Sequence, residues 1–208
     1  MTMTHLHKIT AFILRPAPGG AELLLIQHPY AGIQIPAGTV EPGEDSLAAA
    51  HREAREETGL DDLPGPVFLR STVYPTPEGY SYTLEPTPVF SRPDPLSFNW
   101  AHFRSGLMVR LLRRQAGYAQ VAFEEPDAFP ETNYITYNIT GWVPQCVLAQ
   151  TQMRHFYRFD YSSPTPARWS LQSDNHPFTL FWAPLDNLPK IVEPQDKWIN
   201  LLGYRIKS

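Results

Sequence analysis

The alternation of apolar and polar residues predicts strands in the first third of the chain. In residues 8–14, apolar side chains fall on both sides of the alternation, which is typical of a strand covered on both faces. A turn-forming run, PAPGG at 16–20, separates this strand from a second, strongly apolar stretch. The stretches predicted as strands are residues 8–14, 22–27, 33–35 and 67–74.

Between the last two of these strands, the spacing of apolar residues changes to that of a helix about 13 residues long. Asp45 or Ser46 can accept hydrogen bonds from its first N–H groups, and Gly59 can take the left-handed conformation that ends it. A stripe of small and apolar residues is expected to pack on a sheet. It consists of Leu47, Ala50, Ala54 and Thr58.

Three carboxylates share another face of this helix. At about 100° per residue, Glu53 and Glu57 lie about 40° apart, and Glu56 lies about 60° to the other side of Glu53. Like charges this close cost a few tenths of a kcal/mol per pair. One interpretation is a solvated face on which Arg52 and Glu56 form an i,i+4 pair. The other is that a divalent cation offsets the repulsion, because carboxylate oxygens suit Mg²⁺ or Mn²⁺.

The spacing around the helix decides between these interpretations. Residues 38–60, GTVEPGEDSLAAAHREAREETGL, fit the pattern G-x5-E-x7-R-E-U-x-E-E-x-G-U, in which U is apolar. The stretch therefore resembles the signature of the Nudix hydrolases, although Ala54 is smaller than the Leu, Ile or Val usual at its position. The fixed positions are filled by Gly38, Glu44, Arg52, Glu53, Glu56, Glu57 and Gly59.

The resemblance implies an α/β fold, the Nudix α/β/α sandwich with a mixed sheet, and the end of the chain fits it. Residues 153–160 and 178–182 read as strands joined by a polar loop at 162–176. A terminal helix is predicted at 194–202, ending at Gly203. Its expected core face consists of Trp198, Leu201 and Leu202.

Residues 86–150 are surplus to a minimal domain of this family. Apolar spacing in 97–115 allows a helix, but we expect strands, because 107–112 and 118–123 flank QAG at 115–117 as in a hairpin. The segment resembles the small barrels of bacterial Src-homology-three-like domains; the alternative is a set of Nudix-specific loops and extra strands. The predicted organisation is a first Nudix part at 1–85, a small all-β, barrel-like insertion at 86–150 and a second Nudix part at 151–208.

Composition narrows the class of protein further. The 208 residues carry a net charge of −4, which gives no basic footprint for nucleic acid. No apolar run approaches membrane-spanning length. The single cysteine, Cys146, excludes an internal disulfide and is expected to be a buried small hydrophobe, so a reducing cytoplasm is the predicted compartment. A small nucleotide is the expected partner, a homodimer is a further hypothesis, and the inserted domain could bind a peptide or protein.

The resemblance implies hydrolysis of a nucleoside diphosphate linked to another moiety, with Mg²⁺ (or Mn²⁺) as cofactor. Glu56 and Glu57 match the principal metal ligands of the family, and the carbonyl of Gly38 often adds another. Glu53 matches a position that binds metal or orients the attacking water. Arg52 would hold Glu53 in place, and Glu44 would fix the loop to the helix through Arg52.

A further carboxylate acts as general base in many family members. Asp174 is the first candidate, because it lies in a loop between two strands that flank the site in the family. The sequence leaves Glu124, Glu125 and Glu131 open as alternatives.

The substrate is predicted from weaker signals. The triplet PAG at 36–38 and Pro75, about fifteen residues after the signature, resemble hydrolases of ADP-ribose and nucleoside diphosphate sugars. Tyr30, Tyr74 and Tyr80 are candidates for stacking on a base. The tyrosines also resemble the dinucleoside polyphosphate group, so that class and nucleoside triphosphates stay open. A non-catalytic Nudix-fold nucleotide sensor is the alternative from another functional class.

Overall fold

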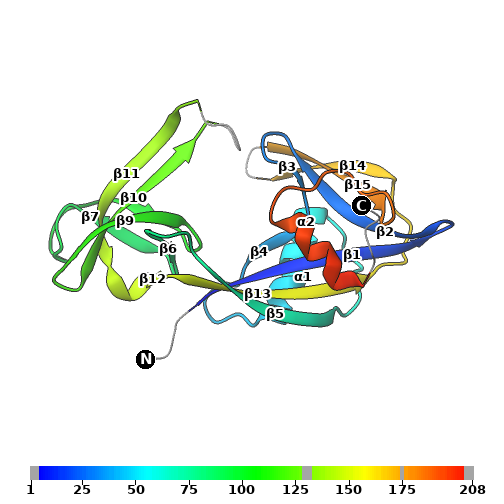
Figure 1. The fold of residues 1–208 in the computed structure, drawn as a ribbon, viewed down its shortest axis with the longest axis horizontal. Coiled ribbons are helices and arrows are strands. Elements are labelled where there is room, and N and C mark those ends of the chain that lie inside the picture. The colour runs from blue at the N-terminus through cyan, green and yellow to red at the C-terminus, as the bar shows by residue number, and fades with distance from the viewer. Residues whose placement is uncertain (1–4, 128–132, 174–175, 204–208) are drawn as a thin grey trace. The chain divides into compact units, whose positions relative to one another are not determined.

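The computed structural model describes residues 5–127, 133–173 and 176–203 (Figure 1). It is mixed α/β, rich in strands, with two sheets. The chain divides into two compact units, and strands β1, β5 and β13 each contribute residues to both. The strand unit comprises 1–8, 39–43 and 72–154, and the helix unit comprises 9–38, 44–71 and 155–208.

The first sheet contains eight strands among the described residues. Its main order is β14-β15-β2-β1-β13-β5, with β3 paired to β2 and β4 paired to β1. The strands are β1 (Leu6–Ala17), β2 (Gly20–His28), β3 (Gly32–Gln34), β4 (Ala37–Thr39), β5 (Val67–Pro75), β13 (Thr151–Asp160), β14 (Arg168–Ser173) and β15 (His176–Pro184). The strands predicted at 8–14, 22–27, 33–35, 67–74, 153–160 and 178–182 are all present.

Helices cover both faces of this sheet within the helix unit. Neighbouring residues of a strand point to opposite faces. On β13, Tyr157 bonds through its hydroxyl to Ser46 of α1 (Ser46–Thr58), whereas Phe156 contacts the ring of Trp198 in α2 (Gln195–Trp198). The sheet therefore lies between α1 and α2, as in an α/β/α sandwich.

Three expectations for the helix unit were wrong. The polar loop predicted at 162–176 contains β14, which pairs with β15 in an antiparallel register. The terminal helix is short: α2 continues as a 3₁₀ turn, η2 (Ile199–Leu202), and Gly203 ends it with φ 73°. Its buried residues are Trp198 and Ile199, because Leu201 and Leu202 are only half-buried.

The second sheet contains seven strands among the described residues, in the order β12-β6-β9-β10-β11-β7-β8. They are β6 (Tyr80–Thr83), β7 (Thr87–Phe90), β8 (Asn99–Phe103), β9 (Met108–Gln115), β10 (Tyr118–Pro126), β11 (Ile135–Pro144) and β12 (Leu148–Ala149), with a 3₁₀ turn η1 (Gln145–Val147) before β12. The predicted hairpin is present as β9 and β10, joined through Ala116 and Gly117, which both have positive φ. The alternative helix at 97–115 is wrong.

The second sheet has its own apolar core, and Cys146 is outside it. The core residues are Val89, Phe103, Val109, Ala119, Val121, Ile139, Val143 and Val147. Cys146 is exposed, which corrects the expectation of a buried thiol. Its neighbour Val147 is the buried residue of this 3₁₀ turn. Among the described residues, no helix has the length and apolar character needed to traverse a bilayer.

Candidate active site

The site is built on α1, whose ends are fixed by local hydrogen bonds. Asp45 caps the first turn, since its carboxylate accepts a hydrogen bond from the N–H of Ala48 at 2.8 Å. Gly59 ends the helix in the left-handed conformation (φ 70°) and donates its N–H to the carbonyl of Arg55. The buried stripe is Ala49, Ala50, Ala54 and Thr58. Leu47 was expected in this stripe but is 48% exposed.

Arg52 connects a carboxylate of the loop before α1 with two carboxylates of the helix itself. Its Nε and Nη2 donate to the two carboxylate oxygens of Glu44 at 3.0 and 2.8 Å, a bidentate pair. Its Nη1 donates to Glu53 at 2.9 Å and to Glu56 at 3.2 Å. Hydrogen bonding to Glu44 raises the pKa of Arg52 further above its usual value. The guanidinium therefore ties the loop before the helix to two carboxylates on the helix.

Glu57 is the buried member of the carboxylate face. Its Oε2 accepts a hydrogen bond from the N–H of Ala37 at 2.8 Å. Burial raises the pKa of Glu57 to about 8, and the charges of Glu53 and Glu56 act in the same direction. A cation beside this face would offset all three causes, because it favours the ionised carboxylate.

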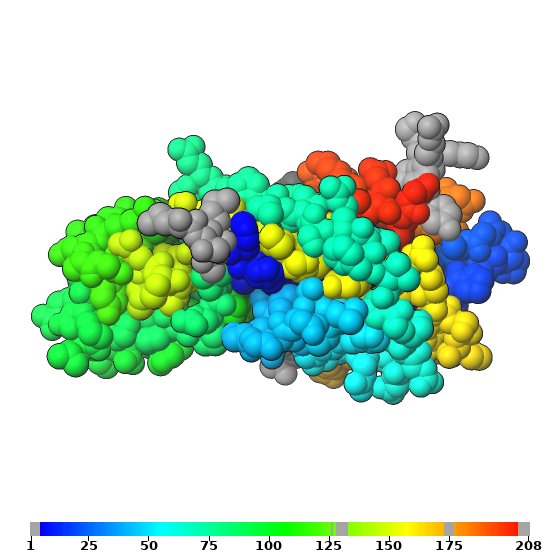
Figure 2. All heavy atoms as spheres, turned by 90° about the horizontal axis from the view of Figure 1, so that it is seen from below, coloured from blue at the N-terminus to red at the C-terminus, as the bar shows by residue number. Residues whose placement is uncertain are grey.

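Glu53 lies directly against the backbone of Gly38. A Cβ atom on Gly38 would overlap the Glu53 carboxylate, so only glycine leaves room for that side chain. The exposed side of α1, with Arg55 and Glu56, lies at the molecular surface (cyan in Figure 2). The loop glycine and the helix carboxylates thus form one contiguous acidic site in the helix unit.

A model of a known protein family matches the part of the chain that contains this site. The model of the NUDIX domain matches residues 6–97, which include the whole of the site described above. Residues 6–97 form a NUDIX domain. Its class of activity is that of a Nudix pyrophosphohydrolase.

Solved structures similar to this chain include two of an Ap4A hydrolase from C. elegans. The binary complex of that hydrolase is 14% identical, covers 96% of this chain and 87% of its own, and has a TM-score of 0.38. A second crystal structure is also 14% identical, covers 97% and 89%, and has a TM-score of 0.36. A search of curated proteins finds no match.

The oxygen donors of this site are of the type that a hard divalent cation binds. The face offers the carboxylates of Glu53, Glu56 and Glu57 next to the backbone of Gly38. Within residues 5–127, 133–173 and 176–203, no three such side chains are already arranged to hold an ion. The Glu56 side chain is 61% exposed, so it can turn away from Arg52 without disturbing the core. These residues could hold Mg²⁺ or Mn²⁺ after that rotation.

Replacing Gly38 with alanine should damage the site more than the fold. The added Cβ would push the Glu53 carboxylate off its position and disturb its hydrogen bond with Arg52. We expect Gly38→Ala to lower turnover by roughly 10- to 100-fold, the cost of a displacement of about 1 Å at a catalytic group. Gly19→Ala is the matched control, since nothing lies within 4 Å of a Cβ there. Equal turnover in both variants would contradict this placement of Glu53.

Of the four candidates for the general base, the structure describes two. Asp174 and Glu131 lie outside the described residues. Glu124 and Glu125 lie on β10 in the strand unit, where Glu124 pairs with Arg110 at 2.7 Å. Asp174 therefore stays a prediction.

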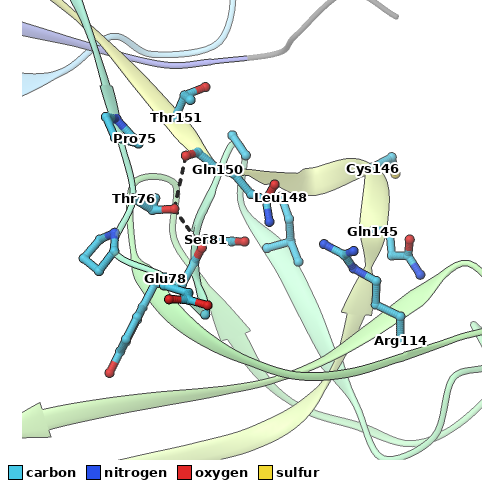
Figure 3. Close-up of a pocket in the computed structure, with 14 residues that line it drawn as sticks. Pro75, Thr76, Glu78, Ser81, Arg114, Gln145, Cys146, Leu148, Gln150 and Thr151 are labelled. Atoms are coloured by element: carbon cyan, nitrogen blue, oxygen red, sulfur yellow. Dashed lines mark hydrogen bonds between the residues drawn. The ribbon is translucent and has the colours of Figure 1, made fainter.

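The four residues predicted to bind substrate do not form one described cluster. Tyr30 lies in the helix unit, is 64% exposed, and donates its backbone N–H to His28 at 3.1 Å. Tyr74 belongs to the strand unit. Pro75 and Tyr80 line a pocket of about 890 Å³ in the strand unit, and Cys146 is another of its lining residues (Figure 3). One wall is fixed by Thr76, whose hydroxyl donates to the carbonyls of Tyr80 at 2.8 Å and Gln150 at 3.1 Å.

Two residues with site-like chemistry were missed from the sequence. Arg154 is a buried arginine on β13, and Tyr82 on β6 lies near its charge. The available signal was the alternation of β13, which places Arg154 on the same face as buried Phe156. A charged residue at a position that the pattern assigns to the core is a candidate for function.

Proposed function

We propose that this chain hydrolyses the diphosphate linkage of a nucleoside diphosphate joined to another moiety, with Mg²⁺ or Mn²⁺ as cofactor. The observation that supports this most is the carboxylate face of α1 held against Gly38. The carboxylates of this face repel one another, and a cation that binds a polyphosphate substrate would offset that repulsion. A divalent ion held there would neutralise charge on the diphosphate.

The protein's own residues have distinct roles in this proposal. Arg52 holds Glu53 and Glu44 through its fork of donors and so fixes the site to the preceding loop. Glu53 orients the attacking water, and Asp174 accepts its proton. The water oxygen bonds to one phosphorus, and the bridging oxygen leaves with the other phosphate. Glu56 and Glu57 are the principal metal ligands, with the carbonyl of Gly38 as an additional one.

ADP-ribose or a nucleoside diphosphate sugar is the proposed substrate class. Support comes from the PAG triplet at 36–38 and from Pro75. Ala37 of this triplet donates its N–H to Glu57, so the triplet is part of the carboxylate site. Dinucleoside polyphosphates and nucleoside triphosphates are the competing classes, with Tyr30, Tyr74 and Tyr80 as candidate stacking surfaces.

The experiment is a turnover screen with Mg²⁺ against the three substrate classes. We expect release of a nucleoside monophosphate from ADP-ribose or a nucleotide sugar, and loss of that product when a chelator replaces the metal. Faster turnover of a dinucleoside polyphosphate or a triphosphate would overturn the substrate class. Tight nucleotide binding without any product would instead show a non-catalytic sensor.

Residues 86–150 are proposed to be an inserted all-β domain with a binding role. Strands β7 to β12 and the core residues of the second sheet lie in this segment, whereas β6 of the same sheet precedes it. Such an insertion could carry a peptide or protein partner or the contact of a homodimer. Gel filtration and light scattering of the full chain would test the homodimer.

A further inference from the structure

The pocket of about 890 Å³ in the strand unit is formed by segments that are distant in the sequence. Its lining comes from the end of β5 and the turn to β6, the start of β6, the end of β9, and residues 145–151 (Figure 3). Backbone hydrogen bonds connect these segments. The N–H of Leu111 in β9 donates to the carbonyl of Gly79 at 2.7 Å, and β12 pairs with β6. The volume is in the range of sites that bind small organic molecules.

Cys146 has a fixed position in this pocket, because the backbone is held on both sides of it. The N–H of Gln145 donates to the carbonyl of Gly117 at 2.9 Å. On the other side, Val147 is buried, and its carbonyl accepts a hydrogen bond from the N–H of Leu84 at 2.8 Å. The side chain of Cys146, the single cysteine of the sequence, is exposed and lines the pocket. An exposed thiol at a fixed position can react with a molecule that the pocket binds.

Arg114 lies at the same end of the second sheet as Cys146. Arg114 of β9 is opposite Ala119 of β10, and Ala119 is opposite Val143 of β11. Cys146 follows Val143 by three residues, in the turn after β11. Both Arg114 and Cys146 line the pocket (Figure 3). A ligand bound to the guanidinium would therefore have its other groups near the thiol.

The pocket also contains a side chain of the opposite charge. Glu78 lies in the turn before β6 and, like Arg114, is an exposed lining residue. In the part of the chain that the structure describes, neither charged group takes part in a hydrogen bond or an ion pair. The two charges thus do not pair with each other, although they line the same pocket. This arrangement is complementary to a ligand that carries both a carboxylate and an ammonium group.

The hydroxyl of Ser81 is a further, independent feature of the pocket. Ser81 is only 1% exposed and is one of the lining residues. Among the described residues, its Oγ has no hydrogen-bond partner. A buried polar group without a partner costs free energy, and a polar group of a ligand would offset that cost. Leu148 adds apolar surface to the lining, so an amide beside short apolar groups, as in an amino acid or short peptide, fits the pocket.

We propose that this pocket is a site of reversible S-thiolation, at which Cys146 forms a mixed disulfide with an amino-acid or short-peptide thiol. Arg114 binds a carboxylate of the incoming disulfide, Glu78 binds its ammonium group, and Ser81 binds an amide. The thiolate of Cys146 attacks one sulfur of the bound disulfide, a new S–S bond forms, and the other half leaves as a thiolate. Cys146 is oxidised and the leaving half is reduced, so the disulfide itself is the oxidant.

The first test is the rate at which the full chain forms a mixed disulfide. The probes are oxidised glutathione, which carries carboxylate and ammonium groups, and hydroxyethyl disulfide, which carries neither. Mass spectrometry measures the adduct, and every adduct reports on Cys146 because the chain has no other cysteine. The rate should saturate with increasing oxidised glutathione and rise linearly with hydroxyethyl disulfide, because only the first probe binds before it reacts. A linear dependence for both probes would show an exposed thiol only and would overturn the proposal.

Arg114→Gln tests the recognition of the carboxylate. It should slow the reaction with oxidised glutathione by roughly three- to tenfold, the scale of one lost hydrogen bond to a charged group, and leave the rate with hydroxyethyl disulfide unchanged. A disturbed thiol would instead react more slowly with both probes, which would contradict the role of Arg114. Arg92→Gln is the matched control, since Arg92 is an exposed arginine of the same unit outside the pocket. Equal rates of the two variants with oxidised glutathione would also overturn this assignment.

Glu78→Gln and Ser81→Ala test the other two contacts. Glu78→Gln should slow oxidised glutathione by about threefold but not dithiodipropionate, a disulfide with carboxylates and no ammonium group. Glu85→Gln, at an exposed glutamate outside the pocket, is its control. Ser81→Ala should slow oxidised glutathione by about threefold without lowering the midpoint of thermal unfolding, because the hydroxyl loses no partner in the fold. Equal slowing of every probe in either variant would contradict its binding role. The site goes beyond the proposed hydrolysis, and these measurements need neither a nucleotide nor a metal ion, so either proposal can fail without the other.

Discussion

Glu57→Gln is expected to lower metal-dependent turnover by roughly 10²- to 10³-fold while the fold is retained. Glutamine has the same shape and can accept the hydrogen bond that Ala37 donates to Glu57. What it removes is the negative charge, on which metal binding depends. The measurement is the initial rate of nucleoside monophosphate release at saturating Mg²⁺, together with circular dichroism.

Glu85→Gln is the matched control, since Glu85 is an exposed glutamate of the strand unit. It should leave the rate unchanged. Undiminished turnover in Glu57→Gln, or full activity of the wild type in chelator, would contradict the assignment of the carboxylate face. Glu56→Gln should also lose activity, and comparison of the two variants at increasing Mg²⁺ would show which ligand contributes more affinity.

The carboxylate site could be predicted from the sequence because its geometry is mostly local. Helical periodicity places Glu53, Glu56 and Glu57 on one face, and Asp45 and Gly59 fix where the helix begins and ends. The contact of Arg52 with Glu44 spans only eight residues. Such features depend on the spacing of a few residues and on caps that have a clear chemical preference.

Features set by long-range pairing could not be predicted in the same way. Strand β14 lies in a polar segment whose composition does not predict a strand. It forms a strand because it pairs with β15. Leu47, in the first turn of α1, is exposed although it falls on the same stripe as buried Ala50 and Ala54. Arg154 is buried on β13, which its own chemistry does not indicate.

The free energy of unfolding of the metal-free protein should fall as pH rises from about 4.5 to about 8. Burial raises the pKa of Glu57 from the usual 4.5 to about 8 in the folded chain. In this window the folded chain keeps a proton that the unfolded chain has released, so unfolding becomes more favourable as pH rises. The loss of stability is on the order of a few kcal/mol and is complete once the folded carboxyl has ionised.

Glu57→Gln isolates this contribution, because it stays neutral at every pH and keeps the acceptor for Ala37. Denaturant unfolding in chelator should give similar stabilities for wild type and variant near pH 4.5, and a variant more stable by a few kcal/mol near pH 9. Mg²⁺ at pH 9 should raise the stability of the wild type and have much less effect on the variant. A constant difference between the two proteins across the pH range would show that Glu57 does not titrate abnormally. The same substitution is thus expected to lower turnover and to stabilise the metal-free fold, because the negative charge needed to bind the cation is destabilising at this buried position when no cation is bound.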